Sequence, residues 1–196
     1  ILANSGLANN YTGATIIQNN YHSPATYTGA TTTVLKLGAD EQIPNGTGDG
    51  LLTFQNGNNA NRAVAFDLNG YNETINGTSV ANAASTVIQN TGSGASTLTI
   101  GDGNTTSAFP GKILDGGAGK TLAIVKIGSG TLALSGANTY GGGTIVNAGT
   151  LAVSGSGTLG SGNITVAGGA TLDVSGKPSA FALGSTQTLT NSSVGA

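Results

Sequence analysis

A four-residue pattern, Thr-Leu-x-(Leu, Ile or Val), recurs along the chain and restricts its fold more than any other feature of the sequence. In an extended strand, the two apolar side chains of the pattern point to one face and the Thr and x side chains to the other. The five copies begin at Thr97, Thr121, Thr131, Thr150 and Thr171. The last three copies follow one another at intervals of 19 and 21 residues. This spacing predicts short strands that recur once per turn of a coil.

A repeat near 20 residues predicts that like side chains stack about 4.8 Å apart on successive parallel strands. The expected inward ladders are Leu132, Leu151 and Leu172, and then Leu134, Val153 and Val174, while Thr131, Thr150 and Thr171 form an outward ladder. A second strand set, at residues 144–146 and 164–166, has a similar period. We therefore predict an all-β fold, a parallel β-helix (β-solenoid) with rungs of roughly 20 residues, about ten turns and a length of roughly 45–50 Å. An antiparallel hairpin array is the alternative, but it would not keep like residues in phase 20 residues apart.

The composition fits a thin core with many corners. Gly accounts for 34 of the 196 residues, and only 7% of the residues are charged. We expect the glycines at 128–130, 155–157 and 168–169, just before strands, to form corners with positive φ. The chain has no Cys, so disulfides and thiolate metal sites are excluded, and stability has to come from stacking one turn on the next.

No linker or shift in composition divides the chain, so a single domain over 1–196 is predicted. Residues 96–196 hold the regular repeats. Residues 1–95 hold degenerate repeats with polar loops, including echoes of the 140–146 segment at Tyr11 and Tyr27. The polar segment from Asp40 to Asp49 contains Pro44 and is expected to bulge out as a loop.

Charge and hydropathy argue against two classes of partner. The net charge is −2, and the basic residues are scattered at Lys36, Arg62, Lys112, Lys120, Lys126 and Lys177. No basic stripe is available to neutralise phosphates, so neither nucleic acid nor an anionic membrane is an expected partner. No apolar run approaches the roughly 20 residues of a membrane helix. The chain opens at Ile1 without a basic segment followed by an apolar one, and we interpret it as a processed or excised piece.

One segment resembles a known repeat family. Residues 126–153 read KIGSGTLALSGANTYGGGTIVNAGTLAV. This run is similar to the autotransporter-associated β-strand repeat, also called the passenger-associated transport repeat, and the segments near Tyr11, Tyr27 and 68–75 look like degenerate copies. The resemblance implies a right-handed parallel β-helix in the exported passenger of a Gram-negative surface protein. It also implies an extracellular or cell-surface location and a role as an adhesin or display stalk, and the repeat carries no catalytic residues of its own.

Two short motifs match nucleotide-binding loops only in part. Residues 155–160 match G-x-G-x-x-G, but a strand pattern follows where a dinucleotide site needs a helix. Gly119-Lys120-Thr121 resembles the end of a P-loop, but position 114 is Leu where the motif requires Gly. We interpret both as corners of the coil.

The remaining candidates also favour structural interpretations. His22 is the single His and is expected to lie in an exposed loop. A polysaccharide-cleaving site needs carboxylates gathered on one face. Here Asp40, Glu41 and Asp49 lie on the polar loop, where adjacent Asp40 and Glu41 point opposite ways in an extended chain, and Arg62 is the lone Arg. The other acidic residues are dispersed; they are Asp67, Glu73, Asp102, Asp115 and Asp173. Oxygen ligands near Asp102 and Asp115 are too sparse for a calcium site. There is no Trp for sugar stacking, and of the five tyrosines Tyr11, Tyr27 and Tyr140 are expected at equivalent corners; the other two are Tyr21 and Tyr71.

The sequence therefore predicts a non-enzymatic protein with no catalytic, cofactor-binding or metal-binding residues. Two functions remain open. The first is a structural or adhesive passenger segment that serves as a display stalk. The second is a self-assembling subunit of an extracellular filament or sheath, in which the chain binds itself end to end because an open coil end recruits further strands. Neighbouring repeats of a longer chain are the other expected partner. A β-helix enzyme acting on carbohydrate is the least favoured interpretation.

Overall fold

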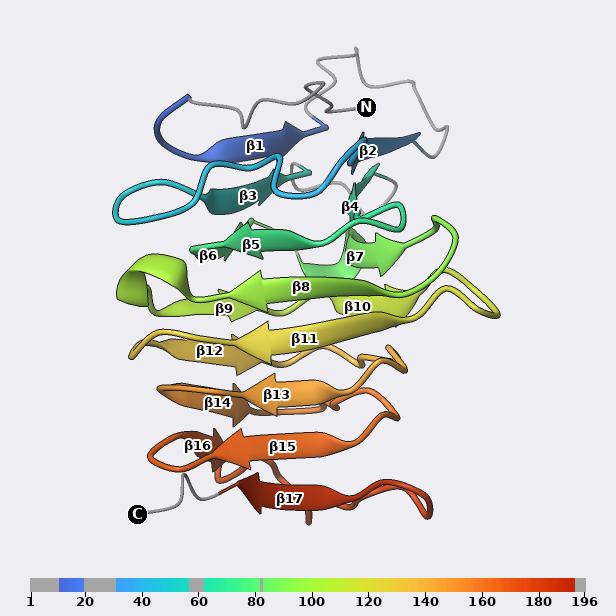
Figure 1. Cartoon of the computed structure of the whole chain (residues 1–196). Coiled ribbons are helices and arrows are strands. Elements are labelled where there is room, and N and C mark those ends of the chain that lie inside the picture. The colour runs from blue at the N-terminus through green and yellow to red at the C-terminus, as the bar shows by residue number, and fades with distance from the viewer. Residues whose placement is uncertain (1–10, 20–30, 57–61, 82, 193–196) are drawn as a thin grey trace.

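The computed structural model describes residues 11–19, 31–56, 62–81 and 83–192. In these residues the chain is all-β, apart from two single 3-10 turns, η1 (Ala83–Ser85) and η2 (Asp102–Asn104). The chain winds through stacked turns, and every pairing between described strands is parallel (Figure 1). The predicted all-β class and parallel pairing are confirmed.

The strands form four sheets. The six-stranded sheet contains β5 (Glu73–Ile75), β8 (Ser96–Ile100), β11 (Leu122–Lys126), β13 (Thr144–Val146), β15 (Ile164–Ala167) and β17 (Leu189–Ser192). One four-stranded sheet contains β9 (Ser107–Phe109), β12 (Thr131–Leu134), β14 (Thr150–Val153) and β16 (Thr171–Asp173). The other four-stranded sheet contains β2 (Thr31–Lys36), β4 (Arg62–Asp67), β7 (Thr86–Asn90) and β10 (Lys112–Asp115). The three-stranded sheet contains β1 (Thr15–Gln18), β3 (Leu51–Gln55) and β6 (Gly77–Val80). The three-stranded sheet meets β9 where the Thr78 hydroxyl on β6 donates to the Ala108 carbonyl, at 2.9 Å.

The predicted ladders are present where the repeat is most regular. Thr131, Thr150 and Thr171 pair in succession on β12, β14 and β16, and so do Leu132, Leu151 and Leu172. Leu134 pairs with Val153, but β16 ends at Asp173, so Val174 lies beyond the last pairing. The side chains of β12 and β14 alternate between half-buried and buried, with the Leu and Val inward. Register here follows from the alternation, because a slip by one residue would expose every Leu.

The five copies of the Thr-Leu pattern do not occupy one sheet, contrary to the simplest interpretation of the sequence. The copies at Thr97 and Thr121 lie in the six-stranded sheet with β13 and β15, whereas the last three form the other stack. Within the six-stranded sheet Leu98 pairs with Ile124, two residues beyond Leu122, the residue at the same place in the pattern. The pattern indicates only which side chains point into the coil and which point out. Strands in different sheets of the coil have the same alternation, so the pattern alone does not predict to which sheet a strand belongs.

The turns are longer toward the N-terminus, which corrects the expected length. Paired residues are 19 to 21 positions apart between β12, β14 and β16 but 25 apart between β9 and β12. The separation reaches 31 between β2 and β4 and 37 between β1 and β3. The three-stranded sheet (β1, β3, β6) meets the four-stranded sheet of β9, β12, β14 and β16 at β6 and β9. Together their described strands form a stack of seven, which is about 30 Å long rather than the expected 45–50 Å.

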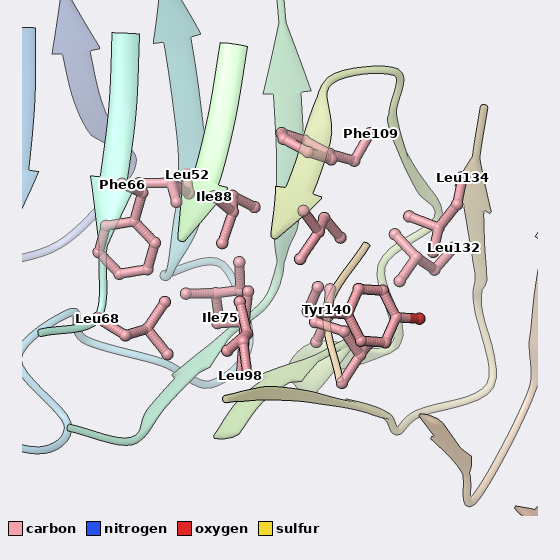
Figure 2. Packing of buried hydrophobic residues seen from close by; sticks show 14 of the residues in the cluster. Leu52, Phe66, Leu68, Ile75, Ile88, Leu98, Phe109, Leu132, Leu134 and Tyr140 are labelled. Carbon is pink, nitrogen blue, oxygen red and sulfur yellow. The ribbon is translucent and has the colours of Figure 1, made fainter. Parts of the chain in front are cut away.

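The core is a column of aliphatic side chains with a few aromatic rings. In Figure 2, Phe66, Leu68, Ile75 and Leu98 lie in one part of the interior, and the Tyr140 ring lies beside Leu132 and Leu134 in another. All of these side chains are buried. The rings of Phe54 and Phe109 have centroids 5.6 Å apart and are tilted by 56°. Burying each such Leu or Ile contributes about 2 kcal/mol, so the stacked column is the main source of stability.

Glycine has two separate roles in the coil. Gly128 has a φ of 68°, as the corner interpretation predicted. Gly130 does not lie in the positive-φ region; a Cβ there would lie 2.4 Å from the carbonyl oxygen of Thr105 in the preceding turn. Glycine is therefore required at Gly128 by backbone conformation and at Gly130 by the close approach of two turns. The sequence analysis predicted the positive φ but not the close approach of the turns.

The segment from Asp40 to Asp49 is irregular, as predicted, but it does not simply bulge into solvent. Gln42 and Ile43 are buried, at 3% and 1% exposure. Glu41 has a φ of 47°, which turns the chain toward the interior. This segment lies against the N-terminal side of β5, so it covers the end of the six-stranded sheet.

Candidate functional site

The two nucleotide-like motifs lie at corners of the coil. Residues 155–160 form a turn in which Gly155 has a φ of 55°, and the strand β15 follows it. Residues 119–121 close a turn in which the Lys120 amide donates to the Gly117 carbonyl, at 3.1 Å, and β11 follows. Neither segment precedes a helix, so neither has the helix N-terminus on which a dinucleotide or P-loop site binds phosphate.

The tyrosines do not form an exposed stacking surface in the described part of the chain. Tyr140 is fully buried, and its hydroxyl lies 2.8 Å from that of Thr144. Tyr11 makes the same contact with Thr15 but is 37% exposed. The predicted equivalence of Tyr11 and Tyr140 thus holds in their hydrogen bonding and fails in their burial. His22, Tyr21 and Tyr27 lie outside the described residues.

Glu73, which the sequence predicted to be apart from the other carboxylates, lies close to Asp40 and Glu41 of the polar loop. The Asp40 carboxylate accepts the Asn72 amide at 2.6 Å, and the Glu41 carboxylate accepts the Thr74 hydroxyl at 3.0 Å. Both contacts flank Glu73 on β5. The expectation that Glu73 is dispersed was wrong because the polar loop, although a full turn away along the chain, is brought by the coil onto β5.

Glu73 occupies an inward position and is 1% exposed. Its two carboxyl oxygens accept the backbone amides of Gln42, at 2.8 Å, and Ile43, at 3.1 Å. Burial is the largest cause that raises the pKa of Glu73, and the like charge of Glu41 also raises it. The amide hydrogen bonds oppose the shift, and the net pKa is about 8. A carboxyl group with this pKa could serve as a general acid, but its burial leaves no room for a polymer substrate beside it.

Asp67 and Asp115 each bind a backbone amide of the following turn. Asp115 accepts the amides of Leu122, at 2.7 Å, and Gly141, at 3.1 Å. Asp67 accepts the amide of Thr91 at 2.9 Å, and its second oxygen lies 3.7 Å from the Lys36 ammonium. These contacts connect successive turns at the corners, so they account for the carboxylates as structural groups.

Asparagine side chains make a set of contacts between turns that the sequence interpretation missed. The carboxamide oxygens of Asn72, Asn104 and Asn163 accept the backbone amides of Thr97, Ser129 and Thr188, respectively, at 2.9, 2.9 and 3.0 Å. In each pair the donor lies 25 residues after the Asn, one turn further along the coil.

Lys126 is a buried cation, and no acidic side chain of the described residues forms an ion pair with it. It is 0% exposed, and its ammonium group donates to three carbonyl oxygens, those of Ile127 at 2.6 Å, Gly128 at 2.8 Å and Ala148 at 3.2 Å. Burial lowers the pKa of Lys126 below the usual lysine value. The ammonium group donates hydrogen bonds to carbonyl groups of two successive turns, so its role is to stabilise the corner at which these turns meet.

The described residues do not group ligands for a metal ion. Over 11–19, 31–56, 62–81 and 83–192, no three side chains of His, Cys, Asp or Glu lie close enough together to hold one. In the same residues no helix is long and apolar enough to cross a bilayer.

Two hollows lie at the C-terminal part of the coil. The larger, about 810 Å³, lies between the turn at 157–161 and the segment at 177–187, with Leu159 and Phe181 in its wall. Gln187 closes one side by donating to the carbonyls of Gly160 and Gly162. The smaller, about 450 Å³, is bordered by glycines at 141–143. Neither hollow holds a group of ionisable side chains suited to catalysis.

Comparison with known families identifies one repeat in the chain. The passenger-associated transport repeat matches at residues 124–153 and again at 1–19. The first match spans β11 to β14, including buried Lys126, Tyr140 and the Leu132–Leu151 ladder. Searches among curated proteins and among solved structures give no significant match. The chain thus carries the repeat of an autotransporter passenger region, consistent with the resemblance noted from the sequence.

Proposed function

We propose that the chain is a right-handed β-solenoid segment of a surface-exported passenger, and that it serves as a rigid structural or adhesive stalk without enzymatic activity. The passenger-associated transport repeat at 124–153 is the observation that carries this proposal. The repeat family implies export to the cell surface. A solenoid suits a stalk because each added turn lengthens the rod while contacting only its neighbours.

The winding of the chain supports the handedness. In Figure 1 the strands β11, β13 and β15 run toward one side at the front, while β12 and β14 run toward the other side behind them. The chain descends with each turn in the sense of a right-handed coil. Parallel strands joined by crossovers are right-handed in nearly all proteins, because the strand twist favours that connection.

The absence of enzymatic activity is part of the proposal. It is supported by the burial of Glu73, the most perturbed carboxyl group, and by the use of Asp67 and Asp115 in contacts between turns. Incubation with a panel of bacterial and host polysaccharides, followed by measurement of new reducing ends, should detect no cleavage. Cleavage that the Glu41→Gln or Glu73→Gln variant abolishes would show that the chain is an enzyme.

Surface display tests the passenger role directly. The chain, with an N-terminal epitope, is placed between an export signal and an outer-membrane translocator in a Gram-negative host. We expect antibody to bind the epitope on intact cells, and the chain to resist added protease because its turns are stacked. An epitope that stays in the periplasm, or an exported chain that is digested as fast as an unfolded polypeptide, would contradict the proposal.

A second candidate function is end-to-end self-assembly, favoured by apolar side chains near the C-terminal end of the described coil. Leu189 on β17 is 51% exposed and Leu183 is 39% exposed. Among the described strands β16 and β17 each have a partner on one side only, so their free edges are open to pairing with another copy.

Light scattering at rising protein concentration, with negative-stain microscopy of the same samples, tests this assembly. Filaments of uniform width would support it, and Leu189→Lys should abolish them by placing a charge at the stacking end. Ile145→Lys is the matched control, because Ile145 is 40% exposed on the lateral face of β13. A monomer at all concentrations would exclude self-assembly and leave the stalk.

A further inference from the structure

The larger hollow of the coil lies under a segment that is held by side chains rather than by strand pairing. This segment, residues 177–187, is called the strap below and lies between β16 and β17. In the described chain no backbone hydrogen bond joins the strap to the turn at 157–161. Lys177 and Gln187 hold it instead, because both donate to backbone carbonyl groups of that turn. The strap therefore stands away from the turn, and the hollow of about 810 Å³ lies between them.

Uncharged polar side chains border the hollow on the side of the coil. Thr139 and Ser161 lie on successive turns, and both are exposed. Their hydroxyl groups have no hydrogen-bond partner within the described residues, so they are free to bind a ligand. Among the described residues no Asp or Glu lines the hollow, and the ammonium group of Lys177 is bound to backbone carbonyls. The hollow therefore favours a neutral ligand with polar groups over a cation or an anion.

One aromatic ring forms part of the wall. Phe181, on the strap, is half-buried, packs in part against the core and also lines the hollow. The other three phenylalanines, Phe54, Phe66 and Phe109, are fully buried. Phe181 is thus the phenylalanine that can contact a ligand. An aromatic ring of this kind can stack on the apolar face of a sugar ring, and the sequence analysis considered only Trp and Tyr for that contact.

The backbone beside the hollow is already used in hydrogen bonds, which argues against a peptide as the ligand. The Thr158 carbonyl accepts the Asn138 carboxamide, at 2.7 Å. The Gly157 and Gly160 carbonyls accept side chains of the strap, and the Ser161 amide donates to the preceding turn. A peptide that adds as a strand binds mainly through main-chain hydrogen bonds, and these groups already have partners. Recognition therefore depends on side chains, and it suits a ligand that supplies hydroxyl groups of its own.

We propose that the hollow under the strap is a binding site for a neutral oligosaccharide. Phe181 stacks on the apolar face of one sugar ring, and the hydroxyl groups of Thr139 and Ser161 form hydrogen bonds with sugar hydroxyls. The volume of about 810 Å³ lies within the range of roughly 300–1,000 Å³ that is typical of small-molecule sites, so it admits a short oligosaccharide. The inference rests on the proposed function, because it names the class of ligand for the adhesive role.

NMR titration of the intact, isotope-labelled chain tests the site. The probes are neutral tetrasaccharides of glucose, galactose, mannose and N-acetylglucosamine at millimolar concentration. We expect at least one of them to bind one-to-one and to shift the amide signals of residues 157–161 and 177–187, while the signals of β5, at the other end of the six-stranded sheet, stay in place. Failure of every probe to bind, or binding that shifts signals elsewhere, would overturn the proposal. Tighter binding of an acidic tetrasaccharide or of an extended peptide would also overturn it.

Two substitutions on the strap test the role of the ring. Phe181→Ala removes the stacking contact and should weaken binding of the sugar about tenfold. Leu183→Ala is the matched control, because Leu183 lies on the same strap, is 39% exposed and does not line the hollow. Its affinity for the sugar should stay unchanged. Equal losses in the two variants, or no loss in Phe181→Ala, would contradict the proposed site.

A third substitution keeps the test independent of the folding of the strap. Thr139 lies outside the strap, and Thr139→Val retains the shape of the side chain while removing its hydroxyl group. We expect the sugar to bind about fivefold more weakly, with the urea midpoint of unfolding unchanged. An unchanged affinity would overturn the proposal. These measurements use the purified chain, so their failure would leave the passenger and stalk roles, which surface display tests separately, as they stand.

Discussion

Substituting Gly136 by Ala should destabilise the coil severely, although the change adds a single methyl group to the chain. Gly136 is buried just after β12. A Cβ at this position would lie 1.7 Å from the carbonyl oxygen of Gly111 in the preceding turn, where real Cβ atoms essentially never approach within 3.0 Å. Backbone atoms cannot rotate away as a side chain does, so the two turns would have to separate locally by more than 1 Å.

The separation would break the hydrogen bonds that join these turns. The Thr139 amide donates to the Ile113 carbonyl at 2.9 Å, and the Ile113 amide donates to the Asn138 carboxamide at 2.9 Å. An added displacement of more than 1 Å takes both beyond hydrogen-bonding distance. The loss of two or three such bonds, together with disturbed packing of Leu134, amounts to about 3–5 kcal/mol of unfolding free energy.

Urea denaturation followed by circular dichroism measures the effect, with Gly184→Ala as the matched control. Gly184 is exposed and lies outside the positive-φ region, and an added Cβ there would have its nearest neighbours at 3.9 Å. We expect Gly184→Ala to change the unfolding free energy by no more than about 0.5 kcal/mol. Equal urea midpoints for the two variants would refute the argument that close approach of the turns dictates glycine at position 136.

Three further substitutions test the ladder, the bridging amides and the buried carboxyl group. Leu151→Ala removes a fully buried member of the ladder and should lower the unfolding free energy by about 2–5 kcal/mol in urea denaturation; a loss below 1 kcal/mol would contradict the stacking. Asn138→Ala leaves the Ile113 amide without its acceptor and should cost about 2–4 kcal/mol. Asn147→Ala, at an exposed site, should be nearly neutral, and equal losses would contradict the bridging role. Because the folded chain holds the Glu73 proton more tightly than the unfolded chain, the unfolding free energy should fall by roughly 1 kcal/mol per pH unit from pH 4.5 to pH 8, and this slope should vanish in Glu73→Gln.

The sequence predicted the regular part of the coil because its repeat carries both phase and period there. The intervals between Thr131, Thr150 and Thr171 are nearly equal. The alternation of side chains and the repeat period therefore predict the same strand register, which the structure has. The prediction weakened where turns lengthen, because the 25-residue step from Ser107 to Leu132 has no matching pattern in sequence. Alternation alone also could not tell which face of the coil holds the strand at Thr97.

The polar contacts between turns were the part that the sequence concealed. Glu73 stands in an inward position where a periodic pattern predicts an apolar side chain, and its partners, Gln42 and Ile43, lie a full turn away. Their proximity depends on the length of the intervening turn, which no local pattern specifies. The same holds for Lys126, whose acceptor Ala148 lies on the following turn. Such contacts become predictable only after the stacking of the turns is known.

The distance between spin labels at Thr74→Cys and Thr190→Cys tests the central structural claim most directly. The chain has no native Cys, so labelling is unambiguous. The two positions are the first and last members of a column that runs across all six strands of the largest sheet, through Thr99, Val125, Ile145 and Thr165. Five strand spacings place their backbones about 24 Å apart, although 116 residues separate them in sequence. Double electron–electron resonance should give one narrow distribution consistent with this separation once the label linkers are included, and a broad or much longer distribution would contradict the stacked parallel coil.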